Sequence, residues 1–287
     1  MHFLYNIPGY FLLLFGGFCL SWGGFIIRSF EEATVWQILL LRSVFFMVAL
    51  MIFLIATYKK NTIKIIKDAG YPAVVGGLVM SLSFIAFVVS MSITTVANVV
   101  FIISTQTMFL AIFGYFYLRE KVSLISFFSI LLAMGGITIM VGDSLSTGSL
   151  LGNIVALAIP INFSILVMII RKNKNLDMVP AIFYSGIFSI IYGLILSESF
   201  TFTSHDILMG FFLGVPQLAF GFICITIGSR STPSTTIGLL MLTETLFAPI
   251  WVWLFLNEIP PAGVIIGGAI IVTAIILKSL DKKTTTN

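Results

Sequence analysis

Charge is scarce in this sequence, because only 9% of its 287 residues are Asp, Glu, Lys or Arg, whereas soluble domains carry about 25%. Hydrophobic residues make up 59% of the chain, and the mean hydropathy is +1.14. A soluble helical bundle needs polar outer faces, which the long apolar segments of this chain lack. We therefore expect a membrane protein that uses the lipid bilayer as its solvent.

Cysteine, histidine and catalytic motifs are also scarce. Cys19 and Cys224 lie far apart in separate apolar runs, so neither a disulfide framework nor a zinc site is expected. His2 and His205 lie near the ends of apolar runs, and no H-E-x-x-H, G-x-S-x-G or phosphate-binding glycine loop occurs. We expect no enzyme, no metal and no cofactor. The net charge of +4 is spread over short connections, so no nucleic-acid partner is expected.

What the chain does contain is ten apolar segments, each long enough to cross a bilayer as a helix of about 20 residues. Their connections are too short to hold a soluble domain. No Lys or Arg precedes the first segment, so we do not expect it to be a cleaved signal. The segments are Gly9–Ile27, Thr34–Tyr58, Ala69–Met91, Thr94–Leu118, Ser123–Val141, Ser149–Ile170, Met178–Leu196, Asp206–Gly228, Ser234–Leu256 and Pro261–Leu277.

Basic residues mark one side of the membrane. They follow the even-numbered segments, whereas the odd-numbered exits carry Arg28 and several carboxylates. The positive-inside rule then predicts that the even connections and both termini are cytoplasmic. We expect a multi-pass protein of the plasma membrane, which in a bacterium is the inner membrane. The signal is carried by Lys59, Lys60, Lys64, Lys67, Arg119, Lys121, Arg171, Lys172, Lys174, Arg230, Lys278, Lys282 and Lys283.

The sequence also repeats itself. A shift of 138 residues aligns Gln106 with Glu244 and Glu120 with Glu258, and it gives six identities over the sixteen positions of Thr105–Glu120. Five spans in each half is an odd number, so the second half is expected to be inverted relative to the first. The prediction is an all-α membrane protein with ten transmembrane helices arranged as two inverted five-helix repeats, residues 1–142 and 143–287.

Several short motifs stand out in the chain: Ser21-Trp22-Gly23, Arg42, Phe109–Glu120 and Glu244–Glu258. They resemble motifs of a known family, the EamA-type members of the drug/metabolite transporter superfamily. The resemblance implies ten helices from a five-plus-five duplication, and a cavity lined by helices one, three, four, six, eight and nine. It is nearly silent on the substrate. Ala111 stands where the family often has proline, and Asn257 where it often has glycine.

Glu244 lies in the middle of the ninth segment, roughly 15 and 18 Å from its two ends. A carboxylate at this depth costs a few kcal/mol or more unless it faces protein or water, so by default it marks a functional site. We interpret it as a counter-ion for a substrate ammonium or as a proton carrier. The alternative is a structural ion pair with Arg42, which lies eight residues inside the second segment and can reach it by snorkelling.

Amide side chains are predicted to face the same midplane cavity. Gln106 is the repeat counterpart of Glu244, and Asn98 lies two turns earlier and about 80° round the helix. Asn162 lies beside Pro160 near the middle of the sixth segment. Buried amides in lipid bond either to neighbouring helices or to a solute, so both interpretations stay open for each of them.

Two indoles and one further glutamine complete the predicted cavity. Trp22 lies in a glycine-rich part of the first segment, where its indole can stack on a solute or a cation or simply fill a gap. Trp251 shares a helix face with Glu244, one or two turns outward of the carboxylate. Gln217 belongs to a stripe of small residues on the eighth segment, which itself predicts close helix packing. The stripe consists of Gly210, Gly214, Gly221 and Gly228.

These features predict a secondary transporter that moves a small organic metabolite by alternating access between the two repeats. The midplane acid and the aromatic lining favour an amino acid or an amine, moved in either direction, efflux included. The expected partners are a small-molecule substrate and the bilayer, with proton coupling or exchange left open. Two alternatives also stay open: a non-transporting membrane scaffold or receptor, and a transporter of a larger anionic metabolite such as a nucleotide derivative.

Overall fold

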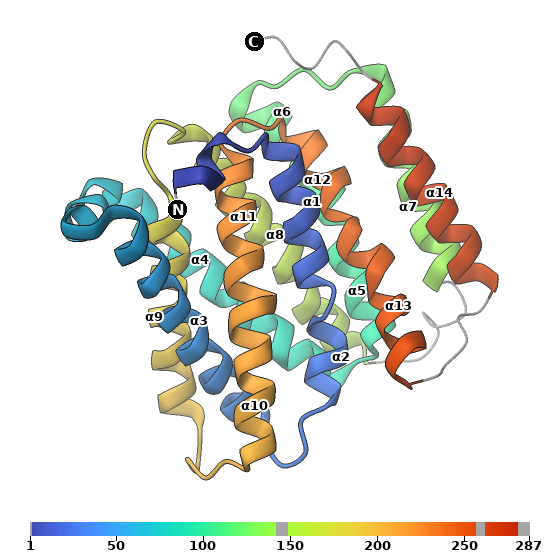
Figure 1. Ribbon diagram of the computed structural model, residues 1–287. Helices are drawn as coiled ribbons and strands as arrows, with labels where there is room; N and C mark the ends of the chain where they lie inside the picture. The colour runs from blue at the N-terminus through green and yellow to red at the C-terminus, as the bar shows by residue number, and fades with distance from the viewer. Residues whose placement is uncertain (1, 142–148, 257–261, 281–287) are drawn as a thin grey trace.

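The computed structural model describes residues 2–141, 149–256 and 262–280, and every regular element in these ranges is helical (Figure 1). Eight helices of these ranges are long and apolar enough to cross a bilayer, which confirms the prediction of an all-α membrane protein. The elements are η1 (His2–Asn6), α1 (Gly9–Leu20), α2 (Gly23–Arg28), α3 (Val35–Tyr58), η2 (Lys59–Asn61), α4 (Thr62–Ile93), α5 (Val96–Ser104), α6 (Gln106–Leu118), α7 (Leu124–Val141), α8 (Leu150–Lys172), α9 (Val179–Leu196), α10 (Ser204–Phe212), η4 (Leu213–Ala219), α11 (Phe220–Ser229), α12 (Ser234–Met241), α13 (Thr243–Leu256) and α14 (Ala262–Ser279).

Some sequence predictions concern residues outside the described ranges. These are Glu258, Asn257, the boundary between residues 142 and 143, and the basic residues Lys282 and Lys283.

The longest apolar stretch, Val35–Ile93, changes direction twice. Lys59 ends α3 with a φ of 51°, and Gly70 interrupts α4 with a φ of 55°. Positive φ is open to glycine but costs other residues about 1–2 kcal/mol. Pro72 follows directly, at a position where a restarting helix tolerates proline. The exposed part of α4 before Gly70 therefore forms a short surface segment, and the part after it enters the bundle.

Threonine side chains explain where several helices begin. Thr34 and Gln37 form a capping box at the start of α3, in which each side chain accepts a hydrogen bond from the other residue's backbone N–H. Thr95 caps α5 and Thr203 caps α10 in the simpler way, by accepting from the N–H three residues on. Such caps satisfy amides that the first turn of a helix leaves without a partner.

The predicted glycine stripe packs closely, as expected. A Cβ at Gly214 would lie 2.5 Å from Arg42 O on α3, and one at Gly228 would lie 2.7 Å from Gly9 O on α1. A Cβ at Gly210 would lie 2.9 Å from Leu41 Cβ on α3, and one at Gly221 would lie 3.0 Å from Leu20 Cδ2 on α1. The stripe thus lets α10, η4 and α11 approach two neighbouring helices at backbone distance.

Helices α7 and α14 pair with one another at one side of the molecule (Figure 1). Gly136 and Gly267 face each other there, since a Cβ on either would lie within 2.8 Å of the carbonyl oxygen of the other. Small residues at such a crossing permit close packing in lipid. The remaining helices form the main bundle (Figure 1), whose core includes buried residues of α1, α3, α4, α8, α9 and α11.

Three of the apolar segments are broken partway along their length, which the sequence did not predict. The breaks lie at Ser21–Trp22 between α1 and α2, at Thr105 between α5 and α6, and at Leu242 between α12 and α13. A fourth segment contains η4, a π-helical stretch around Pro216. Interrupted helices in membrane proteins are tolerated where they line a cavity or are buried in protein.

Candidate functional site

Arg42, Gln106, Gln217 and Glu244 all line one cavity of about 50 Å³ inside the bundle. They come from α3, α6, η4 and α13, so elements far apart in the sequence build this wall together. A single water needs roughly 10–15 Å³ of such space, so the cavity has room for a few waters. The other lining residues are mostly apolar or aromatic: Leu20, Met80, Ser83, Phe84, Phe87, Ile103, Ile159, Phe163, Leu218, Phe222 and Met241.

The polar groups of this wall are under-satisfied. The side chains of Glu244 and Gln106 make no hydrogen bond or ion pair with any residue of the described ranges. Gln217 donates from Nε2 to Leu20 O at 3.2 Å, but its Oε1 is buried without a partner among those residues. Buried polar groups nearly always have a partner, so the Oε1 of Gln217 requires an explanation such as a solute or a water.

Arg42 is a charged side chain with only 1% of its surface exposed. Its Nη2 donates to Phe84 O at 2.6 Å, and its guanidinium lies 5.2 Å and 5.7 Å from the ring centres of Phe84 and Phe87. Its Nε has no hydrogen-bond partner among the described residues. The alternative ion pair with Glu244 is not formed, although both side chains line the same cavity.

The two predicted indoles contact each other rather than the cavity. Trp22 and Trp251 stack with ring centroids 3.8 Å apart, and Trp251 Nε1 donates to Ser21 Oγ at 2.7 Å. Phe25 and Phe255 extend the cluster. Neither indole is among the residues that line the cavity. The cluster joins α2 to α13, the helices that continue two of the broken segments beyond the cavity (Figure 1).

The two predicted asparagines also lie elsewhere. Asn98 Nδ2 donates to Thr94 Oγ1 and to Asn153 Oδ1, both at 3.3 Å. Asn162 is half-buried on α8, and neither it nor Asn98 is among the cavity-lining residues. The break at Thr105 separates Asn98 from Gln106, so the helical spacing used to place them on one cavity does not carry across it.

Sequence reasoning missed the α4 side of the cavity. Met80, Ser83, Phe84 and Phe87 lie there, one to four residues apart along a single helix face. Only the resemblance named the third helix as part of the lining, because apolar and aromatic residues look alike whether they face lipid or a cavity. Within the described ranges no three His, Cys, Asp or Glu side chains gather as they would around a metal ion.

At one end of the bundle, hydrogen bonds join the connection between α2 and α3, and the first turn of α3, to residues 199–206. Asp206 accepts from the backbone N–H of Glu31 at 2.9 Å and of Glu32 at 3.3 Å. Gln37 Nε2 donates to Ser199 and to Thr201 O. We call this end of the bundle the acidic face. It is the end where α10 lies, and η1 lies at the opposite end (Figure 1).

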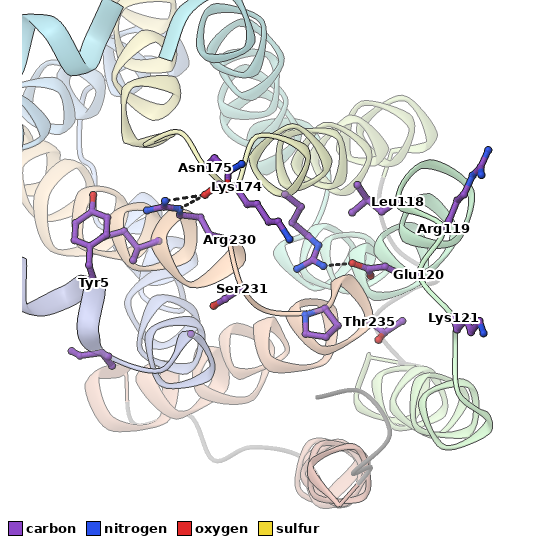
Figure 2. Close-up of a pocket in the computed structure, with 15 residues that line it drawn as sticks. Tyr5, Leu118, Arg119, Glu120, Lys121, Lys174, Asn175, Arg230, Ser231 and Thr235 are labelled. Atoms are coloured by element: carbon purple, nitrogen blue, oxygen red, sulfur yellow. Dashed lines mark hydrogen bonds and ion pairs between the residues drawn. The ribbon is translucent and has the colours of Figure 1, made fainter. Parts of the chain in front are cut away.

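At the other end, which we call the basic face, a carboxylate and a guanidinium join α6 to α8. Glu120 forms an ion pair with Arg171 and also accepts from Ser234 N, the first amide of α12, at 2.9 Å (Figure 2). Arg171 donates in addition to Thr232 O. The turn that aims Glu120 at these partners needs Arg119 in the left-handed conformation, with a φ of 55°.

A second polar cluster on the basic face holds η1. Tyr5 donates to Asp177 Oδ2 at 2.5 Å, Tyr58 donates to the same carboxylate, and the two phenol oxygens lie 2.6 Å apart. Burial, and then the Asp177 charge, raise the pKa of Tyr5 far above its ordinary range. The phenol therefore stays protonated and continues to donate at any physiological pH.

Comparisons with known proteins agree on the type of molecule. A family model described as "EamA-like transporter family" matches residues 7–142 and 150–280. A protein of Clostridium kluyveri named "Uncharacterized transporter" is 25% identical over 232 residues, which cover 75% of this chain and 74% of that protein. A crystal structure of a protein 14% identical covers 95% of this chain and 98% of its own, with a TM-score of 0.80, and so shares the fold.

Proposed function

The chain belongs to the EamA-like transporter family, and from this premise we propose that it is a secondary transporter that moves a small zwitterionic or cationic metabolite, such as an amino acid or an amine, by alternating access. The observation that supports this best is the set of under-satisfied polar groups around one interior cavity. The proposal includes no catalytic step.

We propose ten membrane crossings in two inverted five-helix repeats, with a boundary between residues 142 and 143. The family model matches the chain in two successive stretches, on either side of this boundary. The helix breaks at Thr105 and Leu242 fall within one residue of the 138-residue shift. Ser104 Oγ and Thr245 Oγ1 lie 2.8 Å apart, which brings the two repeat-related segments together beside the cavity. Inverted repeats place substrate sites at such interfaces.

Opposite charges on one cavity wall suit a zwitterion. Glu244 offers a carboxylate to an ammonium group, while the free Nε of Arg42 and the amides of Gln106 and Gln217 offer donors to a carboxylate. Phe84 and Phe87 add aromatic faces around the charged end of Arg42. A solute in the cavity would supply these groups with the hydrogen bonds that no described residue provides.

The cavity is small, which supports the proposal that this structure is a closed form of the transporter. Pockets for small organic ligands measure about 300–1,000 Å³, whereas this cavity measures about 50 Å³. Bonds tie the chain together at both faces, through Asp206 at the acidic face and Glu120 with Arg171 at the basic face. We propose that each set opens in turn, that the basic face is cytoplasmic, and that Trp22 and Trp251 close the acidic side.

Flux measurement in proteoliposomes tests the proposal. Purified wild-type protein is expected to exchange at least one labelled member of a panel of amino acids and amines, and Glu244→Gln is expected to lose that exchange. Glu32→Gln is the matched control, because Glu32 is exposed and lies outside the cavity. If no panel member moves, or if Glu244→Gln keeps full flux, the transport proposal fails and a scaffold or receptor becomes the better interpretation.

Proton coupling is a separate part of the proposal. The carboxylate of Glu244 is the group placed to carry a proton through the cavity. Flux of the transported solute is then expected to follow an imposed pH gradient in wild-type protein. A flux that does not change with the gradient would exclude proton coupling and leave exchange or uniport as the mode of transport.

A further inference from the structure

A second, larger hollow opens on the basic face and belongs to no part of the proposed transport site. Its volume is about 970 Å³, and it shares no lining residue with the midplane cavity. The hollow lies between η1, the end of α6, the end of α8 and the connection from α11 to α12 (Figure 2). Its walls combine apolar residues with several charged side chains.

Among the described residues, five cationic side chains and one carboxylate line this hollow. The cations are Arg119, Lys121, Arg171, Lys174 and Arg230, and the carboxylate is Glu120. Figure 2 shows Arg230 with Tyr5 on one side of the hollow and Arg119 with Lys121 on the other. The lining therefore carries a net formal charge of +4, and an anion between these groups would meet positive charge from several directions.

The carboxylate of the hollow, Glu120, already has partners within the chain. Glu120 pairs with Arg171 and accepts from Ser234 N. Arg230 donates from Nε and Nη2 to Lys174 O, and its guanidinium lies 5.8 Å from the ring centre of Tyr5. These contacts hold the guanidinium at the edge of the hollow and leave Nη1 without a hydrogen bond to any described residue. No ion pair within the described ranges involves Arg119, Lys121, Lys174 or Arg230. Four positive charges thus line one space, and none of them has an ion-pair partner among the described residues.

We propose that this basic hollow binds a phosphate-bearing anion. A dianionic phosphate offers oxygens that match guanidinium and ammonium donors, and the hollow is large enough for a metabolite rather than a single ion. Asn175 and Ser231 add neutral donors to the lining. The phosphate comes either from a soluble metabolite or from a lipid headgroup, because the hollow lies at the membrane surface on the face that basic residues mark as cytoplasmic.

Basic residues on this face also orient the chain in the membrane, and a matched control separates the two roles. Lys121 and Lys174 are exposed side chains of the hollow, and Lys64 and Lys67 are exposed side chains of the same face outside it. The double variants Lys121→Gln/Lys174→Gln and Lys64→Gln/Lys67→Gln remove the same charge. Only the first pair removes charge from the proposed site.

The test measures ligand-dependent melting of the full chain in a neutral detergent, at constant ionic strength set with NaCl. Inorganic pyrophosphate is the soluble probe, and short-chain phosphatidic acid, compared with phosphatidylcholine, is the lipid probe. A ligand that binds only the folded state stabilises it by RT ln(1 + c/Kd), where c is the free ligand concentration, so the melting temperature keeps rising with ligand concentration. We expect a concentration-dependent rise with at least one probe, and a fitted Kd roughly ten-fold weaker in Lys121→Gln/Lys174→Gln.

The arms identify the source of the phosphate. A response to pyrophosphate indicates a soluble ligand, and a response to phosphatidic acid alone indicates a lipid headgroup; both support the site. The inference is overturned if neither probe raises the melting temperature, or if the Lys64→Gln/Lys67→Gln control weakens binding as much as the test variant. It does not depend on amino-acid flux, since the two cavities have no residue in common.

Discussion

Replacing Glu120 by glutamine should make the basic face open more often. Glu120 joins the end of α6 to the end of α8 through Arg171, and to the start of α12 through Ser234 N. Glutamine has nearly the same shape and can still accept a hydrogen bond, but it removes the negative charge. The change therefore tests the ion pair without creating a cavity or a clash.

The size of the effect follows from the burial of the pair. The two side chains are 17% and 19% exposed, so they are shielded better than a surface pair, for which about 0–1 kcal/mol is typical. Hydrogen bonds to charged groups contribute about 1.5–3 kcal/mol. A loss of about 1.4 kcal/mol in the closed form is a reasonable expectation, and it corresponds to about ten-fold more of the open form at equilibrium.

Thiol labelling of Thr235→Cys provides the assay. Thr235 lines the basic hollow but is only 4% exposed, and the native Cys19 and Cys224 are buried, which keeps background labelling low. A charged methanethiosulfonate reagent should react in proportion to the open population. We expect the rate in the Glu120→Gln background to exceed that of the parent by about ten-fold.

A double-mutant cycle decides whether the ion pair is the cause. Arg171→Gln also loosens the face, because Arg171 holds Thr232 O as well as Glu120. If the pair is the relevant contact, adding Glu120→Gln to Arg171→Gln should change the labelling rate little. An unchanged rate in Glu120→Gln alone, or fully additive effects in the double variant, would refute the reasoning.

Two further predictions concern stability. A Cβ at Gly77 would lie 2.5 Å from Tyr184 Cβ, so Gly77→Ala should destabilise the bundle by about 1–3 kcal/mol, while Gly135→Ala, with nothing within 4 Å, should not; equal melting temperatures of the two variants would contradict the packing. Because burial and Asp177 raise the pKa of Tyr5 above the unfolded value of 10.0, the folded chain keeps a proton that the unfolded chain loses. Unfolding stability should therefore be full below about pH 10 and fall above it, and less steeply in Tyr5→Phe; parallel pH profiles in denaturant titrations would count against this.

Much of the fold follows from local chemistry that the sequence displays. Long apolar runs must become helices in lipid, and threonines such as Thr34 and Thr203 mark where helices begin. The glycine stripe of the eighth segment correctly predicts close packing, because a missing side chain on one face of a helix has the same meaning in any neighbourhood. The family resemblance, read from a few short motifs, is confirmed by the family match.

The arrangement of side chains around Glu244 can be predicted only in part from the sequence. The structure brings Gln106, Gln217, Arg42 and Glu244 to one cavity, and each is a polar side chain in an apolar run, which is an unusual and therefore informative signal. Asn98 carries the same signal but lies beyond the break at Thr105, so a helical wheel misplaces it. Hydrogen bonds between distant segments lie beside these breaks, from Ser104 to Thr245 and from Trp251 to Ser21, and periodicity along one segment does not contain such contacts.

The basic hollow illustrates a second limit of the sequence. Its lysines and arginines were read correctly as marking one face, but their convergence depends on how four chain segments end beside each other. The left-handed turn at Arg119 directs Glu120 towards Arg171, and no glycine stands at that position to predict the turn from the sequence. Charge that is scattered in the sequence is thus concentrated in space by the ends of helices.

Recognition of positive charge by Glu244 is the central claim, and one comparison tests it directly. The Kd of the transported amine or amino acid is measured for wild type and for Glu244→Gln, alongside an analogue in which hydrogen replaces the amino group. Wild type should prefer the amine by about ten-fold or more, as a charge-assisted contact inside the bundle requires, and Glu244→Gln should show no preference. A Glu244→Gln variant that still prefers the amine to the same degree would contradict the account.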